Sequence, residues 1–294
     1  VDQSKCVGCK NCERHCPTDA IKVTPGVMPG YVPPCGTACP AGTDVQGYIA
    51  LAGAGRYEDA YRLIRQSNPF PSVCGRICNH PCQAACNRND LDESVGIRDI
   101  KRFVADKAFE NGMPVVEKKR KSNGKKIAVI GAGPSGLSCA YYLQLSGYSV
   151  EVFESESVAG GVLAYGIPEY RLPKAVLNRD IPAIEATGVQ IHLNTTVGED
   201  VSFDELYKKF HAVSASTGTH LSRNANIPGE DLPGVYPVLD FPQAAHLGKP
   251  AEIRTTVAVI GGGHQRLLPA GQAPNIRKAA NQRRHPLGLL WNRH

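Results

Sequence analysis

Ten of the eleven cysteines lie before residue 87, in short groups whose spacing suits electron-transfer chemistry. Residues 6–17 read C-x2-C-x2-C-x3-C-P, a spacing that holds a [4Fe–4S] cluster. The short spacers let three thiolates surround one cluster, and the fourth cysteine often serves a second cluster. A zinc site is disfavoured because such sites usually show two separated CxxC pairs. The predicted ligands are Cys6, Cys9, Cys12 and Cys16.

A second set of cysteines begins with a C-x3-C-P pair at residues 35–40 and continues with four cysteines at every fourth residue over 74–86. On one continuous helix these four would form a stripe, but Pro81 is expected to break that helix. We expect the surrounding helices to bring the distant pairs together. Iron–sulfur binding is favoured, and structural zinc stays open as the alternative. The candidate ligands are Cys35, Cys39, Cys74, Cys78, Cys82 and Cys86.

The cysteine total and the charge pattern indicate the compartment and the class of partner. An odd total in such groups favours metal clusters in a reducing compartment, hence the cytoplasm, over a secreted disulfide framework. The whole formal excess of +6 lies in residues 264–294, which hold six Lys or Arg and no acid, so we expect no nucleic-acid partner. No apolar run approaches the roughly 20 residues of a membrane span.

A glycine-rich turn in the middle of the chain has the chemistry of a dinucleotide site. The run Ile127–Ile130 predicts a buried strand that enters the turn 131–136, followed by a helix to about Ser146 and a second strand, 149–153. The three glycines permit a tight turn, close approach of a pyrophosphate, and close packing of helix on strand. The helix N-terminus favours phosphate, and the acid after the second strand suits ribose hydroxyls. The site residues predicted here are Gly131, Gly133, Pro134, Ser135, Gly136 and Glu154.

The elements that must position these residues divide the chain into several parts. Residues 1–30 form the first cysteine segment, and residues 31–112 a small helical domain. In that domain we expect helices over 45–55, where Asp44 is a cap, over 57–66, with Ala60, Tyr61 and Ile64 inward, and over 97–109. The inward face expected for the last of these helices holds Ile97, Ile100, Phe103, Val104 and Ala108.

A basic linker, 113–125, leads into an α/β region over 126–255, where helix and strand alternate as in a doubly wound sheet. Residues 256–263 begin another strand and glycine turn, with Gly261 and Gly263 in place. There Arg266 takes the third fingerprint position, which needs a small residue, and Pro269 interrupts the expected helix. We therefore interpret residues 264–294 as an atypical basic tail, read in a shifted frame or after a rearrangement; a genuine divergent tail is the alternative.

Residues 35–262 resemble the small (beta) subunit of NADPH-dependent glutamate synthase and its relatives, and residues 6–17 resemble a bacterial ferredoxin segment. The stretches that carry the resemblance are 68–78, 101–108, the glycine turn, and 160–174. The resemblance implies an α/β fold: a Rossmann-like FAD-binding domain preceded by a ferredoxin-type segment and an α-helical iron–sulfur domain. It also implies that further residues lie near the flavin, namely Gly160, Gly161, Leu163, Gly166, Arg171 and Gly218.

The departures from the family concern the clusters. An upstream CxxC of the family falls on Val27 and Gly30, and a Gln or Glu ligand of the family falls on Lys101, whose ammonium does not ligate iron. We therefore expect the ferredoxin-type cluster and one other, which uses Cys39, Cys78 and Cys82 as ligands. Its fourth ligand stays open: Cys35, Cys74 and Cys86 compete for that place or share a further, incomplete cluster. Cys139 is expected to be a small core residue.

The function implied by the resemblance is electron transfer between NADPH, FAD and [4Fe–4S] clusters, with the cofactors doing the chemistry and no catalytic side chain. The expected partner is a redox subunit, either the large subunit of a glutamate synthase or part of a hydrogenase or formate dehydrogenase complex. The NADPH site, which begins at Gly261 and Gly263, is expected to be incomplete. Two alternatives remain: a truncated, non-catalytic fragment that binds a cluster and flavin, and a structural zinc module.

Overall fold

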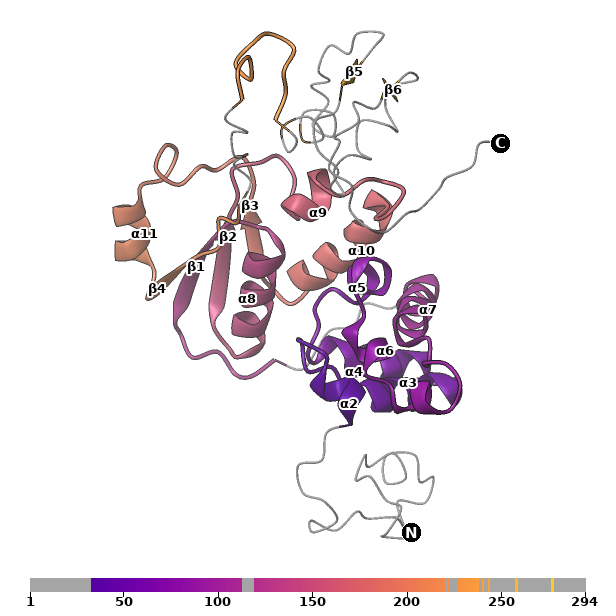
Figure 1. Ribbon diagram of the computed structural model, residues 1–294. Coiled ribbons are helices and arrows are strands. Elements are labelled where there is room, and N and C mark those ends of the chain that lie inside the picture. Colours follow the sequence, from indigo (N-terminus) through magenta and orange to yellow (C-terminus); the bar gives the residue numbers. More distant parts are fainter. Residues whose placement is uncertain are drawn as a thin grey trace. The chain divides into compact units, whose positions relative to one another are not determined.

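The computed structural model describes residues 33–112 and 119–219, together with 222, 227–237, 240, 243 and two short strands (Figure 1). The chain divides into two compact units, Val1–Gly218 and Thr219–His294. Two of the expected sites lie among the described residues, the cysteines of residues 35–86 and the glycine turn 131–136, and both belong to the first unit. The expected ferredoxin segment and the residues Gly261 and Gly263 lie outside the described residues.

The helical part of the first unit is built from short helices around one apolar core. The elements are α2 Pro34–Thr37, α3 Val45–Gly53, α4 Tyr57–Arg65, α5 Pro71–Ile77, α6 Pro81–Ala84, the 3-10 turn η1 Asn87–Asp90, and α7 Ile97–Glu110. Their core includes Val45, Tyr48, Ala60, Tyr61, Ile64, Cys82, Ile97 and Val104.

Local signals explain where these helices begin and end. The Asp44 carboxylate accepts a hydrogen bond from Gly47 N at 2.8 Å, so the expected cap of α3 is confirmed. The cysteines at every fourth residue do not share a helix, because α5 ends at Ile77 and α6 begins at Pro81. His80 between them takes a left-handed backbone with φ of 45°. The break predicted from Pro81 is therefore confirmed.

One expected core residue lies elsewhere. Ile97, Val104 and Ala108 are buried on α7, as predicted, but the prediction is wrong for Phe103, whose side chain is 44% exposed. Phe103 packs edge-on against Tyr57 with ring centroids 5.2 Å apart, so it covers the margin of the helical core instead of filling it.

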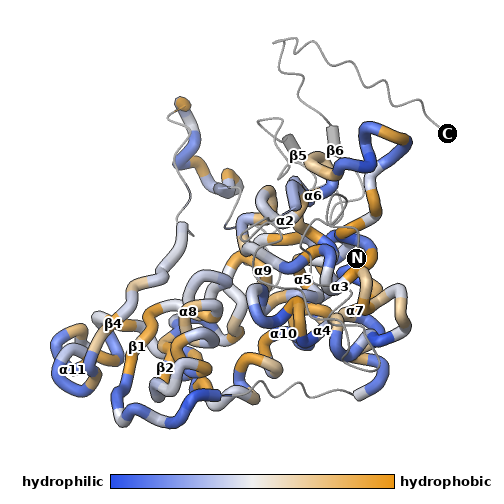
Figure 2. The backbone as a smooth tube through the Cα atoms, turned by 90° about the horizontal axis from the view of Figure 1, so that it is seen from below, coloured by the Kyte–Doolittle hydropathy of each residue, from blue (hydrophilic) through white to orange (hydrophobic). Residues whose placement is uncertain are grey.

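The α/β part contains a parallel sheet in the strand order β3-β2-β1-β4, which confirms the predicted α/β fold. The strands are β1 Lys126–Ile130, β2 Ser149–Phe153, β3 Gln190–His192 and β4 Ala212–Ala215, and the helices are α8 Pro134–Leu145, α9 Val162–Tyr165, α10 Lys174–Glu185 and α11 Phe203–Lys209. Strand β1 is mostly hydrophobic and α11 is mostly hydrophilic (Figure 2), whereas β2 alternates hydrophobic residues with the polar Ser149 and Glu151.

Side chains alternate across this sheet, so helices cover both of its faces. Ile127 and Val129 of β1 share a core with Leu137 and Tyr141 of α8. On the other face Ala128 packs with Leu206 of α11 and with nearby aromatic side chains. Strand β1, which leads into the glycine turn, therefore lies between two apolar layers.

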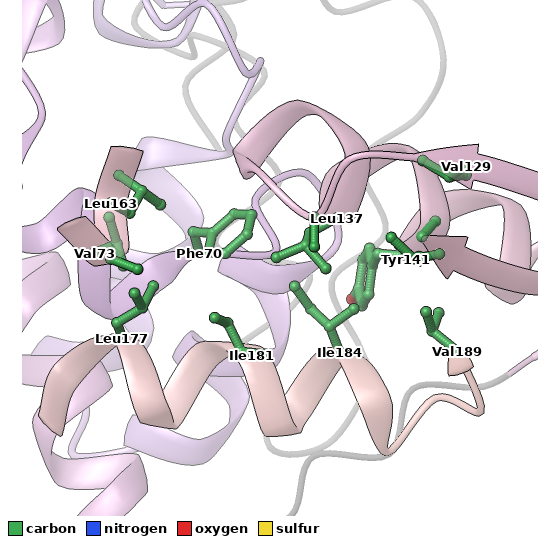
Figure 3. Packing of buried hydrophobic residues seen from close by; sticks show 14 of the residues in the cluster. Phe70, Val73, Val129, Leu137, Tyr141, Leu163, Leu177, Ile181, Ile184 and Val189 are labelled. Atoms are coloured by element: carbon green, nitrogen blue, oxygen red, sulfur yellow. The ribbon is translucent and has the colours of Figure 1, made fainter. Parts of the chain in front are cut away.

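Helix α10 joins the sheet to the helical part. Its side chains Leu177, Ile181 and Ile184 line up opposite residues of both parts (Figure 3). The residues opposite them come from α5 and the segment before it and from α8: Phe70, Val73, Leu137 and Tyr141. One continuous core therefore spans the two parts of this unit.

Two consecutive residues of α10 add polar contacts to this core. The fully buried Asp180 carboxylate accepts hydrogen bonds from the backbone N–H groups of Ser72 at 3.4 Å and Val73 at 3.0 Å, at the start of α5. Burial raises the pKa of Asp180 to about 6, against the lowering effect of these bonds and of Arg65. Its neighbour Arg179 donates to Asp106 of α7 at 2.7 Å.

In the second unit the described strands are β5 Val257–Ala258 and β6 Ile276–Arg277, which pair in parallel. The strand expected to begin at residue 256 is therefore present at Val257–Ala258. Ser222 Oγ donates a hydrogen bond to Asp240 at 2.9 Å. The interpretation of residues 264–294 as an atypical tail stays a prediction.

Replacing Asp180 by alanine leaves two buried N–H groups without their acceptor, so we expect the free energy of unfolding to fall by about 2–4 kcal/mol. Anaerobic urea unfolding followed by far-ultraviolet circular dichroism measures this change. Asp204→Ala, in the exposed first turn of α11, is the control and should cost less than about 1 kcal/mol. Equal small losses in both variants would show that Asp180 does not hold the joint.

Candidate functional site

The glycine turn after β1 is closed on one side and open on the other. Gly131 has φ of 98°, and a Cβ there would lie 2.5 Å from Ser216 O on β4's continuation. A Cβ at Gly136 would overlap Gly131 O, so the start of α8 lies against the turn as closely as the expected packing glycine requires. A Cβ at Gly133 would meet nothing within 4 Å, so the open space lies over that residue.

The N-terminus of α8 faces this open space without a cap. Gly133 is the N-cap residue and offers no side chain, and Pro134 at the first position has no N–H to satisfy. The N–H groups of Ser135 and Gly136 have no acceptor among the residues that the structure describes. Free N–H groups and the positive end of a 12-residue helix form a place for an anion such as a pyrophosphate.

Glu154, at the end of β2, is tied to the same turn. Its carboxylate accepts hydrogen bonds from Ala132 N at 2.7 Å, from Glu156 N at 3.0 Å and from Ser155 Oγ at 3.3 Å, and the side chain is buried. Two oxygens offer about four acceptor sites in all, so about one is left for a ligand hydroxyl. The carboxylate thus fixes the turn and lies beside it.

The loop after β2 returns to the turn. Gly160 N donates to Ala132 O at 2.8 Å, and a Cβ at Gly161 would lie only 3.0 Å from Gly133 Cα. These two glycines therefore belong to the site by contact. Leu163 differs, because its side chain is buried in the core.

Three further predicted residues of this site lie outside the turn itself. Gly166 lies against Val162 in the short helix α9, and the Arg171 side chain is exposed. Gly218 has φ of 71° and open space around its Cα, two residues after the Ser216 carbonyl that packs on Gly131. The structure thus brings together the turn, Glu154, Gly160 and Gly161.

Cys39 lies in a turn whose N–H groups favour the thiolate form of its side chain. Burial alone would raise its pKa, but backbone N–H groups of Thr43 and Ala41 and the charge of Lys101 outweigh burial and lower it. The Thr43 hydroxyl lies close enough to contribute, although its geometry does not meet that of a hydrogen bond. Because the thiolate is the form that binds metal, this turn suits a ligand.

Cys78 and Cys82 lie close to Cys39. His80 N donates to Cys78 Sγ at 3.3 Å, which is a hydrogen bond to sulfur. Burial raises the pKa of Cys82, and the charges of Cys39 and Cys78 raise it further, whereas Lys101 lowers it. The three expected ligands therefore lie close enough to interact electrostatically. Packing of α2 against α6 brings their segments together.

The other three cysteines are not equivalent. Burial raises the pKa of Cys35, and Cys86 adds to that rise, so these two thiols lie near each other. Cys74 is more deeply buried and donates to Asn68 Oδ1 at 3.6 Å, against the core shared with the sheet. All seven described cysteines are free of disulfides.

The described residues hold no group of three Cys, His, Asp or Glu side chains arranged around a single metal ion. In a [4Fe–4S] cluster each thiolate binds its own iron, so the ligands stand farther apart than those of one ion.

Three residues near the three expected ligands had not been singled out from the sequence. Thr43 supplies an N–H to Cys39, His80 supplies one to Cys78, and Arg98 Nη1 donates to Cys78 O at 3.2 Å. The sequence offered a signal for the turns that contain these donors, namely Gly42 after Cys39 and the His80-Pro81 pair after Cys78. In the structure Gly42 and His80 both take left-handed backbone conformations. Arg98 carried no such signal, since it lies within a helix.

A cavity of about 660 Å³ separates the start of α8 from the segment that precedes α5. It is lined by Pro134, Ser138 and Tyr142 on one side and by residues 66–70 and Cys74 on the other. The glycine turn and the cysteine-bearing part are therefore neighbours across one cavity.

The family models match three stretches of the chain. The "4Fe-4S binding domain" matches residues 1–22, "dihydropyrimidine dehydrogenase domain II, 4Fe-4S cluster" matches residues 28–113, and the "NAD(P)-binding Rossmann-like domain" matches residues 129–179.

The glutamate synthase [NADPH] small chain of Escherichia coli is 39% identical to this chain over 211 residues, which are 71% of this chain and 45% of that protein. The chain belongs to the glutamate synthase small-subunit-like family. The NADPH-Fe(3+) oxidoreductase subunit beta of Geobacter sulfurreducens is 41% identical over 80% of this chain and 36% of that protein. The NADP(+)-dependent formate dehydrogenase subunit beta of Moorella thermoacetica is 42% identical over 80% of this chain and 37% of that protein.

The chain thus spans less than half the length of these curated relatives. In the described part of the chain, every helix is too short or too polar to cross a bilayer. The expected resemblance is confirmed, and the boundaries of the domains stay predictions.

Replacing Gly136 by alanine should lower the free energy of unfolding by about 1–3 kcal/mol, because the new methyl group overlaps the carbonyl of Gly131. Gly133→Ala is the matched control, since its Cβ enters open space, and should cost less than about 1 kcal/mol. Urea midpoints of the two variants measure the difference. A Gly133 variant that is as unstable as the Gly136 variant would contradict the described turn.

Proposed function

We propose that this chain is an electron-transfer oxidoreductase subunit that passes electrons between NAD(P)H, FAD and [4Fe–4S] clusters. One observation carries the proposal. The helix N-terminus that is open to a dinucleotide and the helical part that carries the cysteines lie on two sides of one cavity in a single unit, which Pro134 lines on one side and Ala41 and Cys74 line on the other. When bound, the flavin exchanges electrons in pairs with a nicotinamide and singly with a cluster.

The ligands proposed for the cluster in the helical part are Cys39, Cys78 and Cys82. The N–H groups of Thr43 and His80 that point at two of these sulfurs are the donors expected around cluster thiolates. Cys74 is less suited to the fourth place, because its thiol is bonded to Asn68. Cys35 and Cys86 remain the candidates, or they form a separate pair. For the first segment we propose Cys6, Cys9, Cys12 and Cys16, on their spacing and on the matching family model.

The residues proposed to hold FAD are those of the open turn and its neighbours. The N–H groups of Ser135 and Gly136 would bind the pyrophosphate, Gly133 and Gly161 leave room for it, and Glu154 would accept from the ribose. Gly166, Arg171, Leu163 and Gly218 are proposed only on the family resemblance.

The partner proposed for this chain is another redox subunit. Support comes from the names of its relatives, which are the small or beta subunits of a glutamate synthase, a formate dehydrogenase and an Fe(3+) oxidoreductase. A glutamate synthase large subunit is one candidate, and a cytoplasmic formate dehydrogenase complex is another. The NADPH site proposed at Gly261 and Gly263 lies outside the described residues.

Iron analysis of the anaerobically reconstituted full chain tests the clusters. We expect about eight irons and eight sulfides per chain, and the loss of about four of each in Cys78→Ala. Cys139→Ala is the control, because Cys139 lies in α8 and packs against the core of the sheet, and it should keep the full content. Zinc in place of iron, or unchanged iron in Cys78→Ala, would contradict the proposal.

Flavin binding is tested in the same preparation. Gly133→Val should fold but lose bound FAD on gel filtration, because its side chain fills the space that the pyrophosphate needs. Bleaching of the flavin band by NADPH supports electron entry through this chain. Bleaching by dithionite alone restricts the chain to transfer between flavin and clusters, and the absence of any retained flavin contradicts the FAD site.

A further inference from the structure

Lys101 of α7 is a buried cation that has no anionic partner among the residues the structure describes. Its side chain is 6% exposed, and it makes no ion pair with any carboxylate of the residues that the structure describes. The nearest aromatic group is the ring of Tyr48, whose centroid lies 5.8 Å from Lys101 Nζ.

Burial of an ammonium costs several kcal/mol unless charges or hydrogen bonds compensate it. A cation over an aromatic ring returns about 0.5–2 kcal/mol, which is less than this cost. The Tyr48 hydroxyl does not help, because it donates to Ile97 O at 3.0 Å. The missing negative charge must come from another source.

Several cysteines lie in the same part of the fold as Lys101. The ring of Tyr48, which the ammonium faces, belongs to the same buried cluster as Cys82, and Cys35 packs against that cluster. Arg98, on the same helix as Lys101, donates a hydrogen bond to the backbone of Cys78. Lys101 therefore lies beside the part of the fold that holds these cysteines.

An ammonium has three donors and no lone pair, so Lys101 does not ligate iron. We propose that Lys101 is the counter-ion of the cluster held by Cys39, Cys78 and Cys82 and raises its reduction potential. The inference rests on the proposed function, since it requires a cluster with net negative charge at these thiolates. A nearby positive charge stabilises the reduced, more negative state and so raises the potential.

A neighbouring side chain, that of Arg98, adds positive charge to the site. Arg98, one turn before Lys101 on α7, reaches Cys78 O and His80 Nδ1, both at 3.2 Å, and its Nε is buried without a hydrogen-bond partner among the described residues. The carboxylate of Asp99 lies 4.0 Å from Arg98, whereas Lys101 pairs with no carboxylate in the described part of the chain. Lys101 is thus the cation that the cluster alone would balance.

The test is a redox titration of the full chain, purified anaerobically and followed by electron paramagnetic resonance. The relevant signal is the one that Cys78→Ala removes. In Lys101→Met, which keeps the length of the side chain and loses its charge, we expect unchanged iron and sulfide and a lower midpoint potential. Lys107→Met, on an exposed lysine of the same helix that pairs with Glu110, should leave the potential unchanged.

Lys101→Arg keeps the charge, so its midpoint potential should stay near the wild-type value. This variant still tests the role of the charge if Lys101→Met does not fold. An unchanged midpoint in Lys101→Met, or an equal shift in Lys101→Arg, overturns the inference while leaving the cluster in place. Loss of one iron with a three-iron signal in Lys101→Met would make Lys101 a ligand and also overturns it. The absence of any Cys78-dependent signal in the wild type overturns the proposed function itself.

Discussion

The buried carboxylate of Asp180 is the contact on which the arrangement of both sites depends. It accepts the first free N–H groups of α5 from a helix that belongs to the sheet, so it acts as a cap supplied from outside the helical part. The adjacent Arg179 reaches Asp106, which also receives two hydrogen bonds from Arg76 at 2.8 and 3.0 Å. Two neighbouring side chains of α10 thereby hold α5 and α7, the helices that carry Cys74 and Lys101.

This joint has a consequence for electron transfer. The cavity between α8 and residues 66–70 separates the glycine turn from the cysteine-bearing helices, and the joint keeps its two sides in register. A dinucleotide on one side and a cluster on the other would then share one rigid core, built from Phe70, Val73, Leu137 and Leu177. Fixed placement of cofactors is the main contribution that a protein makes to such chemistry.

Much of the fold follows from local signals in the sequence. The glycine fingerprint with its strands, the cap at Asp44 and the break at Pro81 each depend on residues close in the chain, so they were predictable. Phe103 was not, because the helical period shows which residues share a face but not how far the opposing core extends. Asp180 was not either, since an acid within an amphipathic helix is usually exposed, and only the packing of α10 on α5 buries it.

The candidate sites were predictable to different degrees. Each glycine of the turn has a conformational or packing reason that the spacing reveals, whereas the choice among the six cysteines of residues 35–86 depends on which helices pack together. Spacing could not distinguish Cys74, bonded to Asn68 within the core, from Cys78 and Cys82. The sequence did reveal the unusual cation at Lys101, but its burial without a carboxylate partner is a property of the fold.

The proposed ligands Cys39, Cys78 and Cys82 place one iron–sulfur cluster beside Lys101. Iron-edge anomalous diffraction from crystals of the full chain, grown without oxygen, locates the iron. We expect an anomalous peak bounded by these three sulfurs and by the Lys101 ammonium, with Cys74 outside it. A fully iron-loaded chain with no peak at this place, or with a peak at Cys74 instead, would show that these cysteines do not hold the cluster.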